Sequence, residues 1–475
     1  MTLSRRSLLK GASAAVIGFA GLRALGIRGA AALPAVDPYG PLVPDPAGLL
    51  DLPAGFSYNI VSREGAPMAD GFLTPGAFDG MAAFKVRGKP HQVALVRNHE
   101  IWPDMYERSA YGPDLALAAT LPKDKVFDFT PDGRPKFGGT TTLIYDLDAR
   151  RLVRDHLSLA GTTANCAGGA TPWGSWLTCE ETLEKAGAHV NRDHGWVFEV
   201  PSRAKGLVTP IPLKAMGRFV HEAAAVDPKT GVVYLTEDRP DGLFYRFLPD
   251  RKGRLAEGGR LQALALKDGR ERDFRNWPND GKANAGTGQV VAPGVPVEVA
   301  WIDLDGVESP DGDLKDRGRA KGALRFARGE GLAVGTSENG RTEIYVSCTM
   351  GGPIRLGQVF RYRPSPKEGT PGESDEPGAL DLFIETDDAT VLKNCDNAAV
   401  APWGDVILCE DGYDYQAQFL RGVTPAGALY TIAGNTKSEF CGACFSPDGD
   451  VLFVNIQTPG VTFAIRGPWR AAGLQ

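Results

Sequence analysis

The sequence predicts an all-β protein, a β-propeller of six blades with loop insertions and an N-terminal strand that closes the ring. Glycine (59 residues) and proline (35 residues) are abundant while the charged fraction is an ordinary 23%, which suits many short strands joined by many turns. In addition, a pattern of small residues, a turn and a short β-like run recurs six times, several tens of residues apart. Internal repeats of this kind are the signature of a propeller.

Each repeat opens on an acidic residue or a cysteine that is followed at once by small residues. The six opening residues are Asp79, Cys166, Glu222, Glu330, Asp396 and Cys441. In a propeller the innermost strands line the axis, and small residues let those crowded backbones approach each other. Side chains that recur just before these strands would therefore converge on one site. The alternative is that they cap turns at the sheet rim, where Asp favours local backbone hydrogen bonds.

Several repeats also end in a carboxylate, after a turn and a second β-like run. These endings are Glu100, the pair Glu180–Glu181, the pair Glu237–Asp238 and the pair Glu410–Asp411. Adjacent side chains of a strand point to opposite faces, so we expect only one residue of Glu180–Glu181 and one of Glu410–Asp411 to face the axis unless a bulge intervenes.

The N-terminus resembles a twin-arginine export signal in residues 1–32, followed by a single propeller domain in residues 33–475. The motif contains Arg5 and Arg6, then an apolar run that is short for a membrane span and ends near Ala32. The alternative is an uncleaved anchor. Cleavage removes five basic residues and no acidic ones, so the formal charge moves from −6 to −11. We expect a periplasmic or secreted monomer with no stable membrane span, and the acidic charge argues against a nucleic-acid partner.

Two further segments allow structural predictions. The alternating segment Leu49–Ser62 precedes the first repeat, and we expect it to pair with the last blade, which leaves no free sheet edge. The polar segment 364–377 contains four prolines and is typical of a mobile surface loop.

The cysteines and histidines limit the metal chemistry that is available. Seven cysteines are not placed like a disulfide scaffold, and only six histidines are present, none in a metal-binding helical pair. Cys441 and Cys444 have no second pair to complete a structural zinc site. Cys166, in contrast, occupies the same position in its repeat as the carboxylates Asp79, Glu222, Glu330 and Asp396 occupy in theirs. A thiolate among carboxylates suggests a transition metal beside harder cations such as calcium.

The chain resembles the PhoX-type alkaline phosphatases in motifs that cover most of the proposed mature protein. They run from Asn165-Cys166-Ala167-Gly168-Gly169 through Pro172-Trp173-Gly174 to Cys179-Glu180-Glu181, and include Arg218-Phe219-Val220-His221-Glu222, Arg328-Gly329-Glu330, and Pro402-Trp403-Gly404 through Cys409-Glu410-Asp411. The first motif is long and specific, whereas the short arginine and histidine motifs are weak alone. The better-known members of this family are considerably longer.

The resemblance implies a propeller whose axis holds iron and calcium and which hydrolyses small-molecule phosphate monoesters after export by the twin-arginine machinery. It implies that Cys166 is the iron-binding thiolate and Arg328 the phosphate-contacting guanidinium. The metal-binding carboxylates that it implies are Glu181, Glu222, Glu330 and Glu410, with Glu100 as a further ligand. Asp79, Asp396 and Cys441 rest on repeat position alone, and we expect them to be structural residues or outer ligands.

Two other functions remain open from the sequence. One is a calcium-dependent propeller hydrolase of another class, a lactonase or a phosphodiesterase or triesterase, although a thiolate in the site counts against it. The other is a non-catalytic propeller that binds calcium as a structural ion.

Overall fold

The computed structural model describes residues 35–412 and 417–469. The predicted export signal in residues 1–32 lies outside the described residues. None of the helices in the described ranges has the length and hydropathy that a membrane crossing requires.

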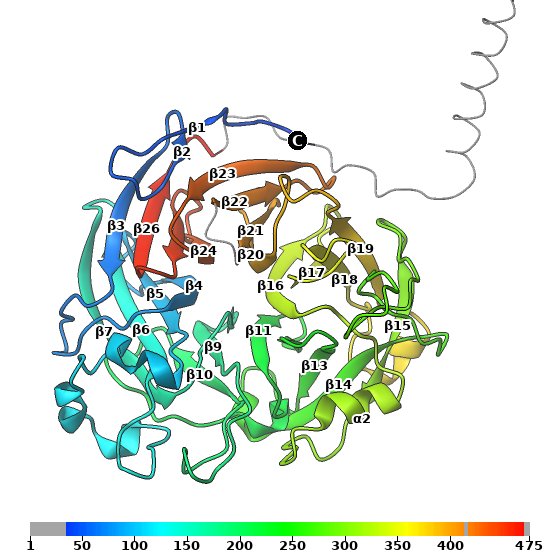
Figure 1. Ribbon diagram of the computed structural model, residues 1–475, viewed down its shortest axis with the longest axis horizontal. Coiled ribbons are helices and arrows are strands. Elements are labelled where there is room, and N and C mark those ends of the chain that lie inside the picture. Colours follow the sequence, from blue (N-terminus) through cyan, green and yellow to red (C-terminus); the bar gives the residue numbers. More distant parts are fainter. Residues whose placement is uncertain (1–34, 413–416, 470–475) are drawn as a thin grey trace, which may run out of the picture.

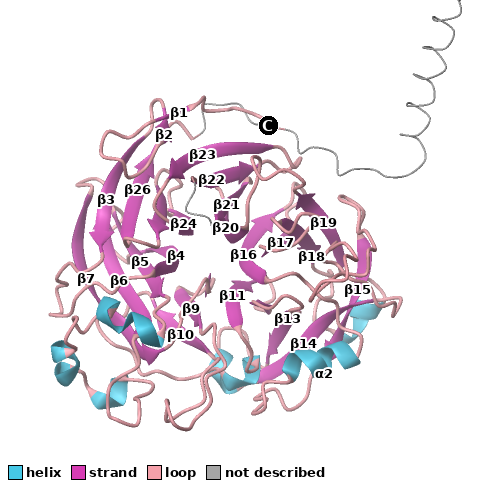
Figure 2. Ribbon diagram, in the orientation of Figure 1, coloured by secondary structure: helices cyan, strands magenta, loops and turns pink. Residues whose placement is uncertain are grey.

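The strands form small sheets arranged radially around one axis, which confirms the predicted propeller (Figures 1 and 2). The first blade consists of β4 (Phe78–Lys85), β5 (Gln92–His99), β6 (Gly138–Asp146) and β7 (Arg151–Thr162). The second consists of β8 (Gly169–Ala170), β9 (Ser175–Cys179) and β10 (Val197–Pro201). The third consists of β11 (His221–Val226), β12 (Val233–Glu237), β13 (Phe244–Pro249) and β14 (Gly259–Leu266).

The remaining three blades complete the ring. The fourth consists of β16 (Gly329–Thr336), β17 (Thr342–Cys348), β18 (Gln358–Arg363) and β19 (Ala379–Glu385). The fifth consists of β20 (Cys395–Val400), β21 (Val406–Glu410), β22 (Gln418–Val423) and β23 (Leu429–Asn435). The sixth consists of β24 (Phe440–Phe445), β25 (Leu452–Ile456), β26 (Val461–Arg466) and β3 (Ser57–Arg63).

The N-terminal strand β3 closes the ring, as the sequence predicts. It pairs antiparallel with β26, with Ile60 opposite Phe463, so the sixth blade takes its outer strand from the beginning of the chain. The innermost strand β24 of this blade packs against β4 of the first. The ring is therefore held by backbone pairing between segments about 400 residues apart.

The other elements connect or cover the blades. Strand β15 (Val297–Asp303) pairs with both β14 and β19, so the third and fourth blades share one nine-stranded sheet. Strands β1 (Leu42–Val43) and β2 (Leu52–Pro53) form a separate small sheet. The helices are α2 (Leu314–Ala320), η1 (Pro103–Arg108), η2 (Ala116–Thr120), η3 (Lys123–Lys125), η4 (Lys214–Met216), η5 (Leu255–Glu257) and η6 (Pro371–Ser374).

Small residues let the innermost strands approach each other closely, as expected. A Cβ at Gly80 would lie 1.6 Å from the Ala167 carbonyl oxygen, and one at Gly169 would lie 1.7 Å from the Ala224 carbonyl oxygen. Such distances are possible only without a side chain. All six innermost strands line an axial cavity of about 380 Å³. The hydrophobic core lies between neighbouring blades, where apolar side chains of adjacent sheets interdigitate.

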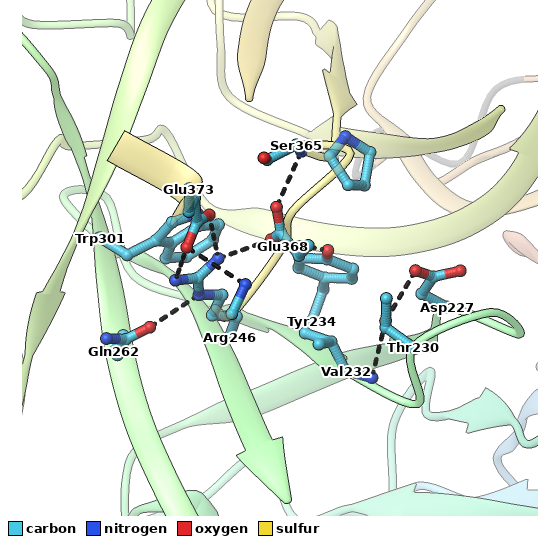
Figure 3. A network of polar contacts seen from close by, with 12 residues as sticks. Asp227, Thr230, Val232, Tyr234, Arg246, Gln262, Trp301, Ser365, Glu368 and Glu373 are labelled. Atoms are coloured by element: carbon cyan, nitrogen blue, oxygen red, sulfur yellow. Dashed lines mark hydrogen bonds and ion pairs between the residues drawn. The ribbon is translucent and has the colours of Figure 1, made fainter. Parts of the chain in front are cut away.

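The polar segment 364–377 is anchored to the third blade, in contrast to the expected mobile loop. The Arg246 guanidinium on β13 pairs with Glu368 at 2.7 Å and with Glu373 at 2.5 Å, and it lies over the Trp301 ring (Figure 3). The Tyr234 hydroxyl also donates to Glu368, at 2.9 Å. A buried arginine is costly unless it is paired, so these contacts hold the segment in place.

Candidate metal centre

The six residues that open the repeats lie at the same end of the innermost strands, and all six are buried. We call Asp79, Cys166, Glu222, Glu330, Asp396 and Cys441 the inner column. In five blades the pairing register between the first two strands shifts by one residue at or just after this position. Such a shift is a β-bulge, which bends the strand and re-aims a side chain, and bulges are common beside active sites.

A second set of residues follows the second strand of each blade, by one position in five blades and by two positions after β9 in the second blade. We call Glu100, Glu181, Asp238, Thr349, Asp411 and Gln457 the outer column. In every blade the outer-column N–H donates to the carbonyl of the residue two positions before the inner column. The N···O distances run from 2.8 Å, between Glu100 and Ala77, to 3.3 Å, between Gln457 and Glu439. This repeated hydrogen bond places the two columns side by side.

Four of the residues that accept these hydrogen bonds have a left-handed backbone. Their φ angles are 45° at Ala77, 46° at Ala164, 55° at Arg328 and 48° at Asn394. This conformation costs a non-glycine residue roughly 1–2 kcal/mol, and such strain concentrates at functional sites. The backbone next to the inner column is therefore held in a conformation that local preference alone does not favour.

The two columns bring their side chains together in four groups of potential metal ligands. The groups are Asp79–Glu100–Cys166, Cys166–Glu181–Glu222, Glu222–Glu330–Asp396 and Asp396–Asp411–Glu439, with the ligand atoms of each within 4.8 Å of one another. Neighbouring groups share Cys166, Glu222 or Asp396, so the ligand atoms form one continuous arc. The inner-column members are buried, whereas Glu100, Glu181, Asp411 and Glu439 are half-buried, so the cluster is least covered on its outer-column side.

Without bound cations, the carboxylates of the cluster cannot all carry their negative charge at neutral pH. Burial raises the pKa of Glu222 well above its ordinary range, and the charges of Glu330 and Glu181 raise it further. Burial together with the Asp411 charge raises the pKa of Asp396 to about 7. Two like charges 4.8 Å apart repel by about 3 kcal/mol at an effective dielectric constant of about 20.

The side chains of the cluster are suited to binding cations. Glu222 Oε2 is buried and has no hydrogen-bond partner among the described residues, although buried carboxylate oxygens are normally satisfied. Its other oxygen, Oε1, accepts a hydrogen bond from the Ala167 N–H at 3.2 Å. A cation at this position would satisfy the orphaned oxygen and neutralise the neighbouring carboxylates.

Five of the six metal ligands suggested by the resemblance belong to these groups, and the sixth does not. Cys166, Glu181, Glu222, Glu330 and Glu100 are all members. In contrast, the carboxylate of Glu410 points away from the axis into the fifth blade, and Asp411 takes the place that we expected for it.

The position of Glu410 has a physical cause that recurs in other blades. Its carboxylate pairs with Arg421 at 2.8 Å and accepts the Phe419 N–H at 3.0 Å. Glu237 likewise accepts the Leu243 N–H at 3.1 Å, and Glu180 accepts the Gly195 N–H at 3.0 Å. In these blades the residue before the outer column therefore accepts hydrogen bonds from N–H groups near the start of the third strand. Because adjacent side chains point to opposite faces, this contact directs Glu410 into the blade and Asp411 toward the axis.

Arg328 lies against the cluster, and acidic residues engage its guanidinium. Nε and Nη2 bind the two Asp238 oxygens at 2.7 Å each, and Nη2 also pairs with Glu330 at 2.9 Å. Its side chain is 21% exposed. A bidentate pair of this kind fixes the plane of the guanidinium. Any contact to phosphate uses other donors of Arg328 or displaces one of these partners.

Four acidic residues of the cluster, Asp79, Asp396, Asp411 and Glu439, were not among the ligands implied by the resemblance, and Asp238 belongs to its surroundings. Asp79 and Asp396 are members of the groups although we expected structural residues or outer ligands. Glu439 was missed, and Asp238 charges the surroundings of Glu181 and Glu330. Cys441 is outside the groups, because its thiol donates to the Phe78 carbonyl at 2.8 Å.

Behind the metal centre, a buried histidine stands between two carboxylates. His194 Nδ1 lies 2.6 Å from Glu180 and Nε2 lies 3.2 Å from Asp128. Although burial alone would lower the pKa of His194, these carboxylates raise it to about 9. The imidazolium therefore neutralises Glu180, the residue next to Glu181 in the cluster.

Comparisons with known proteins place this geometry in a family. PhoX from Pseudomonas fluorescens, solved in complex with vanadate, a transition state analogue, superimposes with a TM-score of 0.65 at 18% identity, over 92% of this chain and 98% of that one. A gluconolactonase from Xanthomonas campestris covers 91% of this chain and 99% of its own at 13% identity, with a TM-score of 0.37. No curated protein matches by sequence. The family model for alkaline phosphatase PhoX matches residues 37–460. The chain therefore belongs to the alkaline phosphatase PhoX family and is a phosphatase.

Proposed function

We propose that this phosphatase hydrolyses phosphate monoesters at the axial cluster and that the cluster holds both a transition metal and harder cations. The observation that carries the proposal is the arc of four ligand groups joined by shared residues. Family membership supports the phosphatase activity, and the carboxylates at the end of the propeller axis supply the only four such groups among the described residues.

The donor atoms suggest which ions would bind where. Cys166 belongs to two groups, and a thiolate favours a softer transition metal, for which iron is the proposal. The groups Glu222–Glu330–Asp396 and Asp396–Asp411–Glu439 offer only oxygen, which suits calcium. When bound, such cations neutralise charge on the transferring phosphoryl group and lower the pKa of a bound water.

The chain itself orients the substrate and supports the ligands. Asp238 and Glu330 hold the Arg328 guanidinium at the edge of the cluster, where a planar cation suits phosphate oxygens. The repeated hydrogen bonds between the columns keep the carboxylates in place, so little reorganisation is needed when charge develops. We also propose export by the twin-arginine route, which the Arg5–Arg6 motif supports.

The direct test is turnover of p-nitrophenyl phosphate by the metal-loaded protein, before and after removal of the ions with a chelator. We expect hydrolysis that is lost on chelation and restored by calcium and iron together. A matched pair of variants in the third blade locates the site. Glu222→Gln should lower turnover by about 100-fold or more, because it removes a shared ligand. Glu237→Gln should retain the bound ions, because its carboxylate contacts Leu243 and Tyr245 instead.

Other substrates separate the alternatives. If the loaded protein hydrolyses bis(p-nitrophenyl) phosphate or a lactone but no monoester, the proposed reaction is wrong although the metal site stands. If it binds calcium and hydrolyses none of these compounds, it is a binding propeller.

A further inference from the structure

A basic groove lies between the first and second blades, at the end of the blades that faces away from the metal centre. Its volume is about 640 Å³. The cationic residues that line it are Lys85, Arg87, Lys89, Arg154, Arg203 and Lys205. They come from the β4–β5 turn, the start of β7 and the segment after β10, and all three segments line the same groove. Ile144, Val153 and Trp173 give the groove an apolar lining.

The cations of this groove lack acidic partners among the described residues. No acidic residue lines the groove. Within residues 35–412 and 417–469, five of the six cations make no ion pair or side-chain hydrogen bond, and Arg154 donates to the Lys205 carbonyl at 2.6 Å. In a chain of net charge −6, six exposed cations around one hollow create a local positive potential that attracts anions.

A buried histidine provides a second and independent sign of a ligand. His156 lines the groove, is only 2% exposed, and has no hydrogen-bond partner at either ring nitrogen within the part of the chain that the structure describes. The nearby Ala204 carbonyl does not reach hydrogen-bonding geometry with it. Buried ring nitrogens are normally satisfied, so an acceptor supplied by a ligand would complete this site.

We propose that the groove binds a soluble polyanion that carries several phosphate groups. The phosphates would contact the cations and His156, while any apolar part would lie against Ile144, Val153 and Trp173. Several charges are required because a single monoanion cannot neutralise six cations, and the arginine fork matches phosphate oxygens. A hollow lined by cations on three segments suits a compact ligand or chain better than it suits the flat surface of a bilayer.

The groove is separate from the metal centre. Asp79 is the second residue of β4 and Lys85 is the last, so the two sites lie about 20 Å apart along this strand at about 3.3 Å per residue. Ligand binding in the groove therefore does not require the catalytic cluster. The proposal can fail or succeed whether or not the enzyme hydrolyses monoesters.

The test compares binding of fluorescein-labelled polyphosphate by the metal-loaded protein and two variants, read by fluorescence anisotropy in calcium-containing buffer. Arg87→Glu/Lys205→Glu should weaken binding by about tenfold or more, because each reversal removes an attraction and adds a repulsion. The control, Arg63→Glu/Lys123→Glu, reverses two exposed cations that also lack side-chain partners, and should bind within about twofold of the unmodified protein. Turnover of p-nitrophenyl phosphate should be the same in all three proteins.

Two results would overturn the proposal. One is equal polyphosphate binding by the unmodified protein and the groove variant. The other is cosedimentation of the unmodified protein with phosphatidylglycerol vesicles, lost in the groove variant, without binding of labelled polyphosphate; this would assign the groove to a membrane surface.

Discussion

Replacing His194 by glutamine should destabilise the protein strongly near pH 6 and much less above pH 9. The side chain is fully buried between Glu180 and Asp128, which raise its pKa from 6.5 to about 9. A folded-state pKa above the unfolded value means that folding favours the protonated ring. The stabilisation is therefore complete below about pH 6.5 and is lost as the pH rises through about 9.

The size of the effect follows from the pKa difference. At 1.36 kcal/mol per pKa unit, a rise from 6.5 to about 9 corresponds to about 3 kcal/mol of stability. Glutamine keeps a polar group at this position but carries no charge. The difference in unfolding free energy between the two proteins should therefore shrink by about 3 kcal/mol between pH 6 and pH 9.5.

Urea unfolding of both proteins at pH 6, 7.5 and 9.5 measures this difference, and the subtraction removes the contributions of all other titrating groups. His91→Gln is the matched control. His91 pairs with Asp148 on the surface, with side chains 66% and 70% exposed, so its loss should cost less than about 1 kcal/mol at every pH. A His194→Gln penalty that stays constant across this pH range would refute the reasoning.

Two pairs of variants test the other parts of the account. Asp411→Asn should weaken metal binding by about 10–100-fold, because Asp411 belongs to a ligand group. Glu410→Gln should keep the metal content but lower the unfolding free energy by about 1–3 kcal/mol, because it weakens the pair with Arg421. Elemental analysis and thermal unfolding measure the two effects, and the opposite pattern in the two variants would contradict this assignment. Gly80→Ala should destabilise by about 1–3 kcal/mol or more, because its Cβ would lie 1.6 Å from a carbonyl oxygen, while Gly206→Ala, with nothing within 4 Å, should stay within about 0.5 kcal/mol. Equal urea midpoints for the two glycine variants would show that the innermost strands do not need this close approach.

The repeat in the sequence was sufficient to predict the propeller, the closing strand and the convergence of acidic and thiol side chains near its axis. These features depend on patterns that the chain carries locally: small residues at the axis, turns between short strands, and an acid or thiol at or just before the start of each innermost strand. Asp79 and Asp396, which repeat position alone had singled out, lie in the candidate ligand groups beside five of the six residues that the resemblance implied.

The remaining features depend on contacts between residues that are distant or on backbone geometry. Glu410 and Asp411 cannot be distinguished without Arg421, which lies in the next strand and binds Glu410. The left-handed backbones at Ala77 and Ala164 have no signal in the sequence, because alanine does not favour that conformation. Glu439 could have been found, because it stands two residues before the inner column, as Arg328 does.

The order of the anchored segment 364–377 also depends on a residue that is distant in the sequence. Its prolines and charges indicate a surface loop, but Glu368 and Glu373 pair with Arg246, more than 100 residues earlier in the chain. Composition describes the segment itself, whereas its order comes from a partner on another blade.

The metal content and visible absorption of the purified protein, compared with those of Cys166→Ser, test the central claim most directly. The account predicts that the unmodified protein contains calcium and iron, absorbs visible light through the thiolate–iron bond, and hydrolyses p-nitrophenyl phosphate. The variant should lose the absorption and most of the turnover, because Cys166 is shared by two ligand groups. A metal-free protein with full turnover, or a variant with unchanged absorption and activity, would contradict the account.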